Sequence, residues 1–218
     1  MATPAELVLA DPRTAADLRT FVTRARAAED GAVRLQAGGK VLAAYVCVMR
    51  PRLLGEAMPT ILGLRTMPLA DPAEVDVTVP LASVADRLAR MGVDDAVLPL
   101  PPVGANEAWA AVSPPRGGWS RTGELGTDEL IAAAKAGVRD VADTVPANPG
   151  ALIVNNVRAT VWGRPLPDAP QVPAGAAFAG YALGFWAPGG TASVYEEARW
   201  VRISTAQGHV LVRPAASL

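Results

Sequence analysis

The side chains that could do chemistry gather near the C-terminus, in a predicted β-hairpin. Strand-forming residues fill 199–205 and 208–213, and the short Ala206-Gln207-Gly208 connection between them predicts a turn. The hairpin contains no acid and carries four cationic or titratable side chains: Arg199, Arg202, His209 and Arg213. Such a set could hold one or two phosphates, although Glu196 and Glu197, directly before it, would oppose an anion.

His209 and Cys47 are the histidine and the cysteine of the chain, and neither lies in a motif typical of an active site or a metal site. One imidazole without a second histidine or a cysteine cluster gives no common transition-metal ligand set. No Gly-x-Ser-x-Gly nucleophile elbow is present, and the glycine triplets at 38–40 and 116–118 lack phosphate-loop spacing. Cys47 lies in an apolar stretch, which is typical of a small buried side chain. The sequence therefore predicts a non-enzymatic protein with no cofactor and no metal.

Composition limits the partners and the compartment. The 218 residues carry 20 Lys and Arg against 21 Asp and Glu, a net charge of −1. Nucleic-acid-binding proteins usually concentrate positive charge, so nucleic acid is not an expected partner. A single cysteine, an N-terminus unlike a secretory signal and no apolar run of about 18 residues favour a cytoplasmic protein without a membrane segment.

Residues 1–96 are predicted to form an α+β domain. Asp11-Pro12 supplies a helix start, and this helix should end near Asp30. A second helix is expected at 81–91. Between the helices, alternating or continuous apolar residues predict four antiparallel strands, with Gly38-Gly39 as a hairpin turn. The expected strands are 33–37, 40–49, 60–67 and 74–79.

A proline-rich linker, residues 97–119, is expected to separate this domain from residues 120–218. The C-terminal part is predicted to contain three helices followed by the hairpin, an order typical of a winged helix. Thr127 is expected to cap the first of these helices. The expected helices are 127–145, 148–162 and 175–186.

The third of these helices argues against a DNA-reading winged helix. Such a helix contacts base edges with charged or amide side chains, whereas residues 175–186 offer only Tyr181 for hydrogen bonding. We therefore expect a protein–protein interaction or self-association module, with an unidentified protein or a second copy as the partner. The hairpin wing of a nucleic-acid-binding regulator is the alternative, and a small-ligand carrier built on the N-terminal sheet is the second. The expected interaction surface comprises Trp186, Trp200, Arg199, Arg202, His209 and Arg213.

Four stretches of the chain resemble a family of uncharacterised actinobacterial proteins. They are Val161-Trp162-Gly163-Arg164-Pro165-Leu166-Pro167, residues 173–179, residues 200–213 and, less specifically, residues 32–37. The resemblance extends along most of the chain and implies a two-domain organisation. It implies no activity and no site residues.

Overall fold

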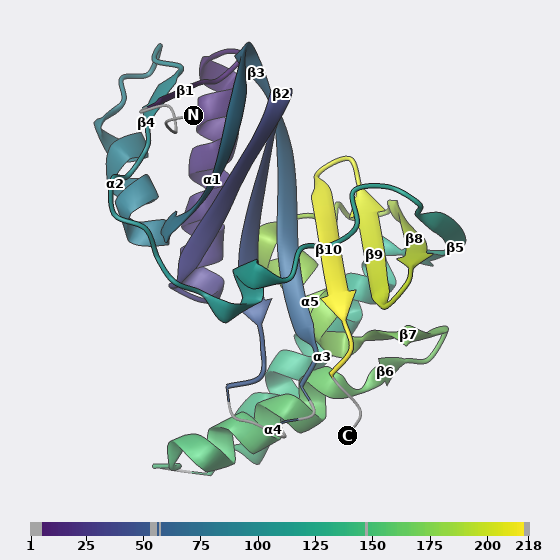
Figure 1. Cartoon of the computed structure of the whole chain (residues 1–218). Coiled ribbons are helices and arrows are strands. Elements are labelled where there is room, and N and C mark those ends of the chain that lie inside the picture. Colours follow the sequence, from purple (N-terminus) through teal and green to yellow (C-terminus); the bar gives the residue numbers. More distant parts are fainter. Residues whose placement is uncertain (1–5, 53–55, 57, 147, 216–218) are drawn as a thin grey trace. The chain divides into compact units, whose positions relative to one another are not determined.

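The computed structural model describes residues 6–52, 56, 58–146 and 148–215 (Figure 1). The chain divides into two compact units, each built from two stretches of sequence. The first unit comprises residues 1–47 and 64–113, and the second comprises residues 48–63 and 114–218. No helix formed by the described residues is long and apolar enough to span a membrane.

The first helix of the first unit, α1 (Pro12–Ala28), begins where the sequence predicts. Asp11 is its N-cap, and one carboxylate oxygen accepts a hydrogen bond from the backbone N–H of Thr14 at 2.7 Å. This hydrogen bond lowers the pKa of Asp11, because it favours the ionised carboxylate. Leu18, Phe21 and Val22 form the buried face of the helix.

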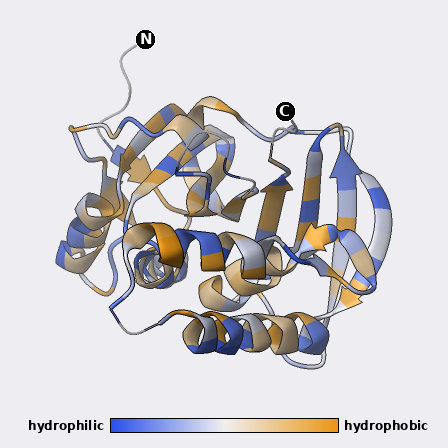
Figure 2. Ribbon diagram, turned by 90° about the horizontal axis from the view of Figure 1, so that it is seen from below, coloured by the Kyte–Doolittle hydropathy of each residue, from blue (hydrophilic) through white to orange (hydrophobic). Residues whose placement is uncertain are grey.

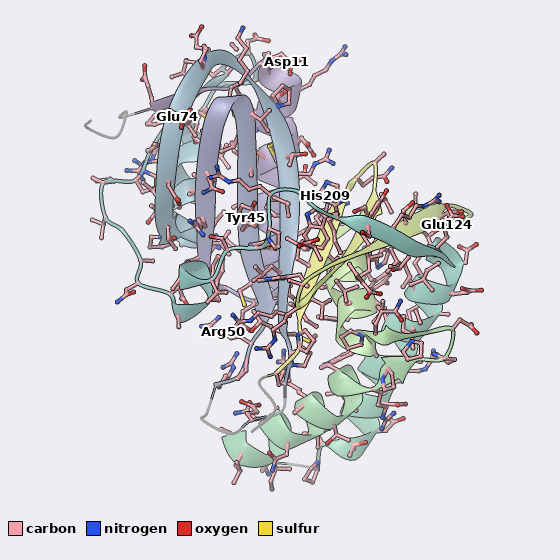
Figure 3. The ribbon with its side chains drawn as sticks, turned by 45° about the vertical axis from the view of Figure 1, so that its right-hand side comes forward. Asp11, Tyr45, Arg50, Glu74, Glu124 and His209 are labelled. Atoms are coloured by element: carbon pink, nitrogen blue, oxygen red, sulfur yellow. The ribbon has the colours of Figure 1, made fainter. Side chains whose placement is uncertain are left out.

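Two long β elements, β2 (Ala32–Met49) and β3 (Thr60–Pro80), take the place of the four expected strands. Figure 3 shows each ribbon folding back on itself at a tip. Gly39, from the predicted Gly38-Gly39 turn, is exposed and has a positive φ of 58°, a conformation that glycine adopts easily. Its N–H donates to the carboxylate of Glu74 at 3.2 Å, which joins the tips of the two elements.

Several shorter elements complete the first unit. They are α2 (Leu81–Arg90), the paired strands β1 (Glu6–Val8) and β4 (Val97–Pro99), and the 3-10 helix η1 (Ala108–Ala111). Arg19 of α1 donates to the Leu88 carbonyl of α2 at 2.8 Å. Arg34 of β2 pairs with Asp76 of β3 at 2.7 Å and donates to the Ala110 carbonyl of η1 at 2.9 Å.

The second unit combines helices with short strands. The helices are α3 (Thr127–Thr144), α4 (Ala151–Gly163) and α5 (Ala174–Leu183). The strands are β5 (Ser120–Gly126), β6 (Pro165–Leu166), β7 (Ala169–Pro173), β8 (Thr191–Glu197), β9 (Trp200–Thr205) and β10 (Gly208–Arg213). Figure 2 shows hydrophobic and hydrophilic residues interspersed along these elements, as expected where one face is buried and the other is not.

The expected fold class was wrong for the C-terminal part. The fold is α+β with a large sheet in the order β2-β3-β10-β9-β8-β5, and not a four-stranded sheet followed by a three-helix winged-helix-like domain. The predicted hairpin, β9 and β10, lies inside this sheet, so each of its strands has a neighbour on both sides. A wing requires a hairpin that projects with unpaired edges. The strand β5, which has no apolar alternation, supplies the part of the sheet that the sequence did not indicate.

Thr127 does not cap α3, contrary to expectation. The N-cap is Gly126, and Thr127 is buried with 1% exposure. Its hydroxyl donates to the Ala187 carbonyl and accepts from the Gly190 N–H at 2.9 Å. Thr127 therefore ties the start of α3 to the loop that follows α5.

The end of α5 decides where two large aromatic rings lie. Gly184 has a left-handed backbone with φ of 74°, and the Phe185 N–H bonds back to the Gly180 carbonyl at 2.7 Å, the pattern of a Schellman motif. The chain then turns back, so that the Trp186 ring covers Gly180 and its Nε1–H donates to the Ala177 carbonyl at 2.8 Å. A Cβ at Gly180 would lie 2.0 Å from this ring, so only glycine fits there.

The substitution Gly180→Ala tests this close contact. Alanine ordinarily stabilises a helix interior relative to glycine, but here the methyl group would have to displace the Trp186 ring. We expect the free energy of unfolding, measured in urea, to fall by about 1–3 kcal/mol. Gly163→Ala is the matched control, because the added Cβ would meet no atom within 4 Å. Equal stability of the two variants would contradict the close packing.

Candidate functional site

The polar face of the β9–β10 hairpin is set by strand alternation. His209 lies opposite Ser204, and Leu211 lies opposite Arg202, so these residues share one face of the sheet with Arg213. The other face carries Thr205 and Gly208, which contact Phe185 after α5. We call the first of these faces the hairpin outer face: Arg202, Ser204, His209, Leu211 and Arg213.

The structure separates the residues of the expected interaction surface. Trp186 lies in the core beside α5, and Trp200 is also buried; each ring is 6% exposed. These two tryptophans therefore do not form an exposed aromatic patch. Arg199 is exposed in the turn between β8 and β9. The hairpin outer face brings together Arg202, His209 and Arg213, and alternation along β9 places the buried Trp200 on the same face.

His209 has a hydrogen-bond partner within the hairpin. Its Nδ1 lies 2.9 Å from the Ser204 hydroxyl on the facing strand. Figure 3 labels His209 on this hairpin, beside the ribbon that leads towards β5. This contact pairs two polar side chains across the β9–β10 ladder.

Arg202 makes cation–π contacts with two aromatic rings. Its guanidinium carbon lies 4.6 Å from the centre of the Trp119 ring and 4.5 Å from the centre of the Tyr195 ring. Tyr195 is the direct neighbour of Arg202 across the β8–β9 ladder. Trp119 comes from the segment before β5 and is fixed by a hydrogen bond from its Nε1–H to the Pro115 carbonyl at 3.0 Å. We call this cluster the Arg202 stack: Trp119, Tyr195 and Arg202.

The charge of Arg202 has no counterion in the part of the chain that the structure describes. No hydrogen-bond acceptor and no carboxylate contacts its guanidinium there, and Nε is buried without an acceptor. Burial lowers the pKa of Arg202, and the interaction with Tyr195 partly opposes this effect. The two aromatic faces are thus the groups that compensate the cation.

Sequence reasoning found Arg202 but missed both rings. Tyr195 lies on β8, and its pairing with Arg202 depends on the register of β8 and β9. Trp119 was placed in the linker. The signals available were an aromatic residue, Tyr195, directly before the paired acids Glu196 and Glu197, and an arginine, Arg202, near the start of the next strand.

A second candidate site is a pocket of about 250 Å³ near the end of β10, which we call the proline pocket. Five proline rings line it: Pro59, Pro165, Pro170, Pro173 and Pro214. The rest of the lining comes from Gly163, Gln171, Val212 and Ala215. No lining residue is charged, and Gln171 is the one with a hydrogen-bonding side chain.

No sequence pattern indicated the proline pocket, because its walls come from segments that lie far apart in the chain. The prolines around 165 and 173 flank the small hairpin β6–β7, and Pro214 follows β10. In sequence these prolines indicate only where helices and strands stop. The pocket lies wholly in the second unit, so it does not support the ligand carrier expected on the N-terminal sheet.

The fold resembles that of sliding clamps. Along 99% of its length the chain is similar to a DNA polymerase sliding clamp from Caulobacter crescentus, with a TM-score of 0.54 and 11% identity. The beta subunit of DNA polymerase III from Pseudomonas aeruginosa gives 0.53 at 12% identity over 98% of the chain. The matches span only 66% and 65% of those chains. Identity this low shows a sliding-clamp-like fold and nothing further.

Family models place the chain more narrowly. Residues 2–110, half of the chain, match a domain of unknown function, DUF8010, and the chain belongs to this family. Residues 114–217 match a second domain of unknown function, DUF8185. No curated protein matches the chain. The two matches support the resemblance to a family of unknown function, while they carry no information on an actinobacterial origin.

Proposed function

We propose that this protein is a non-enzymatic protein–protein interaction module in which the proline pocket receives an apolar side chain of a partner. The observation that carries the proposal is the chemistry of the pocket walls. Proline rings are rigid and lack a backbone N–H, so they present a preformed apolar surface that loses little entropy on binding.

The size of the pocket favours a side chain over a metabolite. Small-molecule sites usually measure about 300–1,000 Å³ and place several polar groups around the ligand. At about 250 Å³, with Gln171 as its one polar side chain, the proline pocket suits one large apolar side chain of an extended segment. The glutamine amide could then bond to the backbone of that segment.

Two similar structures support binding by this kind of fold. A sliding clamp from Bartonella birtlesii, with a TM-score of 0.50 and 9% identity, is bound to griselimycin. A clamp from Caulobacter crescentus, at 0.53 and 11%, holds polyethylene glycol at a putative beta-motif tethering region. These ligands belong to those proteins, and they motivate the same kind of role here.

A different protein is a better partner than a second copy joined at β5. This strand ends the sheet order, so its outer edge could add a strand from another chain. A register irregularity between Arg121 and Gly123 and the Arg121–Glu124 ion pair protect the edge against such pairing. Both features are common ways to prevent edge-to-edge association.

The variant Gly163→Leu tests the pocket directly. Gly163 lines the pocket, and a Cβ added there would meet no atom within 4 Å. A leucine side chain at this position should therefore extend into the pocket without disturbing the fold. Peptides selected from a displayed random library by the wild-type protein should bind this variant at least about tenfold more weakly, a loss of roughly 1.4 kcal/mol.

Gly150→Leu is the matched control, because Gly150 lies at the other end of α4, is open to the same extent and does not line the pocket. The control should bind the selected peptides like the wild type. Equal binding by Gly163→Leu, or failure to select any peptide, would contradict the proposal.

A second candidate function is association with DNA, which the charge of one helix pair favours. The helices α1 and α2 pack together and carry six arginines: Arg13, Arg19, Arg24, Arg26, Arg87 and Arg90. They carry only two acids, Asp17 and Asp86. This local excess contrasts with the net charge of −1 and would suit phosphate contacts.

If α1 and α2 contact DNA, the protein should bind a labelled duplex at about 50 mM salt, and binding should weaken steeply as salt rises. The double variant Arg13→Ala/Arg90→Ala removes two exposed cations and should reduce the salt slope by about two. Arg213→Ala, on the hairpin outer face, is the control and should bind like the wild type. Absence of binding at low salt would remove this candidate.

A further inference from the structure

The Arg202 stack leaves the hydrogen-bonding edge of the guanidinium unused. The ring centres of Trp119 and Tyr195 lie 4.6 Å and 4.5 Å from the guanidinium carbon, so both rings contact the cation. The N–H groups of a guanidinium lie in its plane and point outwards along the edge. Stacking therefore compensates the charge but satisfies none of these donors.

A side chain with a purely structural role would lose free energy of hydration in this arrangement. A partly buried cation without a counterion loses hydration that two aromatic faces replace only in part. Among the described residues no acceptor reaches the guanidinium of Arg202, and Nε is buried without a partner. An apolar side chain would pack against the two rings without this loss.

The stack is also prepared for binding. The Trp119 ring is fixed by its 3.0 Å hydrogen bond to the Pro115 carbonyl, and Tyr195 by its place in the β8–β9 ladder. A guanidinium in contact with two fixed rings has few rotamers left to lose when a ligand arrives.

We propose that the Arg202 stack binds the carboxylate of an acidic side chain from a partner protein. A carboxylate meets a guanidinium edge-on through two parallel N–H···O hydrogen bonds, the geometry that the stack leaves open. The choice of a protein as the partner rests on the proposed function. The choice of a carboxylate as the ligand rests on the Arg202 stack alone.

The local charge favours a carboxylate over a phosphate. On the same face of the sheet, Arg213 and Glu197 lie on the strands either side of β9 and carry opposite charges. One uncompensated positive charge therefore remains at Arg202. That charge matches a carboxylate of charge −1, whereas a phosphate group of nearly two negative charges needs further donors.

Nuclear magnetic resonance of ¹⁵N-arginine-labelled protein tests the proposal, with the side-chain N–H signals of Arg202 assigned by their loss in Arg202→Lys. The probes are acetyl-Gly-Glu-Gly-amide, its glutamine counterpart and inorganic phosphate. We expect the glutamyl peptide to shift the Arg202 signals saturably and more than those of other arginines. The uncharged glutaminyl peptide should leave them in place.

Tyr195→Leu removes one ring of the stack and should weaken binding of the glutamyl peptide by roughly two- to fivefold, the value of one cation–π contact. Tyr181→Leu is the control, because Tyr181 is a half-exposed tyrosine on α5 outside the stack. It should bind like the wild type. Unchanged signals from the other arginines show that each variant is folded.

Three results would overturn the proposal: no response of Arg202 to the glutamyl peptide, an equal response to the glutaminyl peptide, or a stronger response to phosphate. Gly163→Leu separates this proposal from the proposed function. That variant should lose the selected apolar peptides and still show the full glutamyl response at Arg202, so each site can fail without the other.

Discussion

Aromatic rings packed directly on glycine backbones hold the second unit together. The Trp186 ring covers Gly180 within α5, the Trp162 ring covers Gly137 of α3, and the Phe185 ring covers Gly208 at the start of β10. A Cβ at these glycines would lie 2.0, 2.2 and 2.5 Å from the nearest ring atom, in that order. Helices and strands can approach this closely only where a side chain is missing, so the three contacts fix how α3, α4, α5 and the hairpin pack.

This packing makes the two faces of the hairpin different in character. The face towards α5 is filled by buried side chains such as Ile203 and Val210. The other face, the hairpin outer face, carries the polar side chains Arg202, Ser204, His209 and Arg213. The proposed partner contacts lie on this face and at the proline pocket near the end of β10.

Local sequence patterns predicted individual helices and strands well, but they did not predict how the strands pair into a sheet. Asp11 caps α1 as expected, because capping depends on residues three apart. The sheet depends on pairs far apart in sequence, and β5 carries no alternation that would mark it as a strand. Trp186 was expected on an exposed aromatic surface, at the end of a helix predicted to span residues 175–186. Gly184 ends that helix early and turns the ring into the core, which only the backbone conformation reveals.

The burial of Trp186 is the most direct test of this account, because the packing and the assignment of faces both follow from it. In protein labelled with 5-fluorotryptophan, each of the five tryptophans gives a fluorine signal whose shift between H₂O and D₂O reports contact with solvent. We expect almost no solvent shift for Trp186, which is 6% exposed, and a larger one for the half-buried Trp119. A solvent shift at Trp186 as large as that at Trp119 would show an exposed ring and contradict the account.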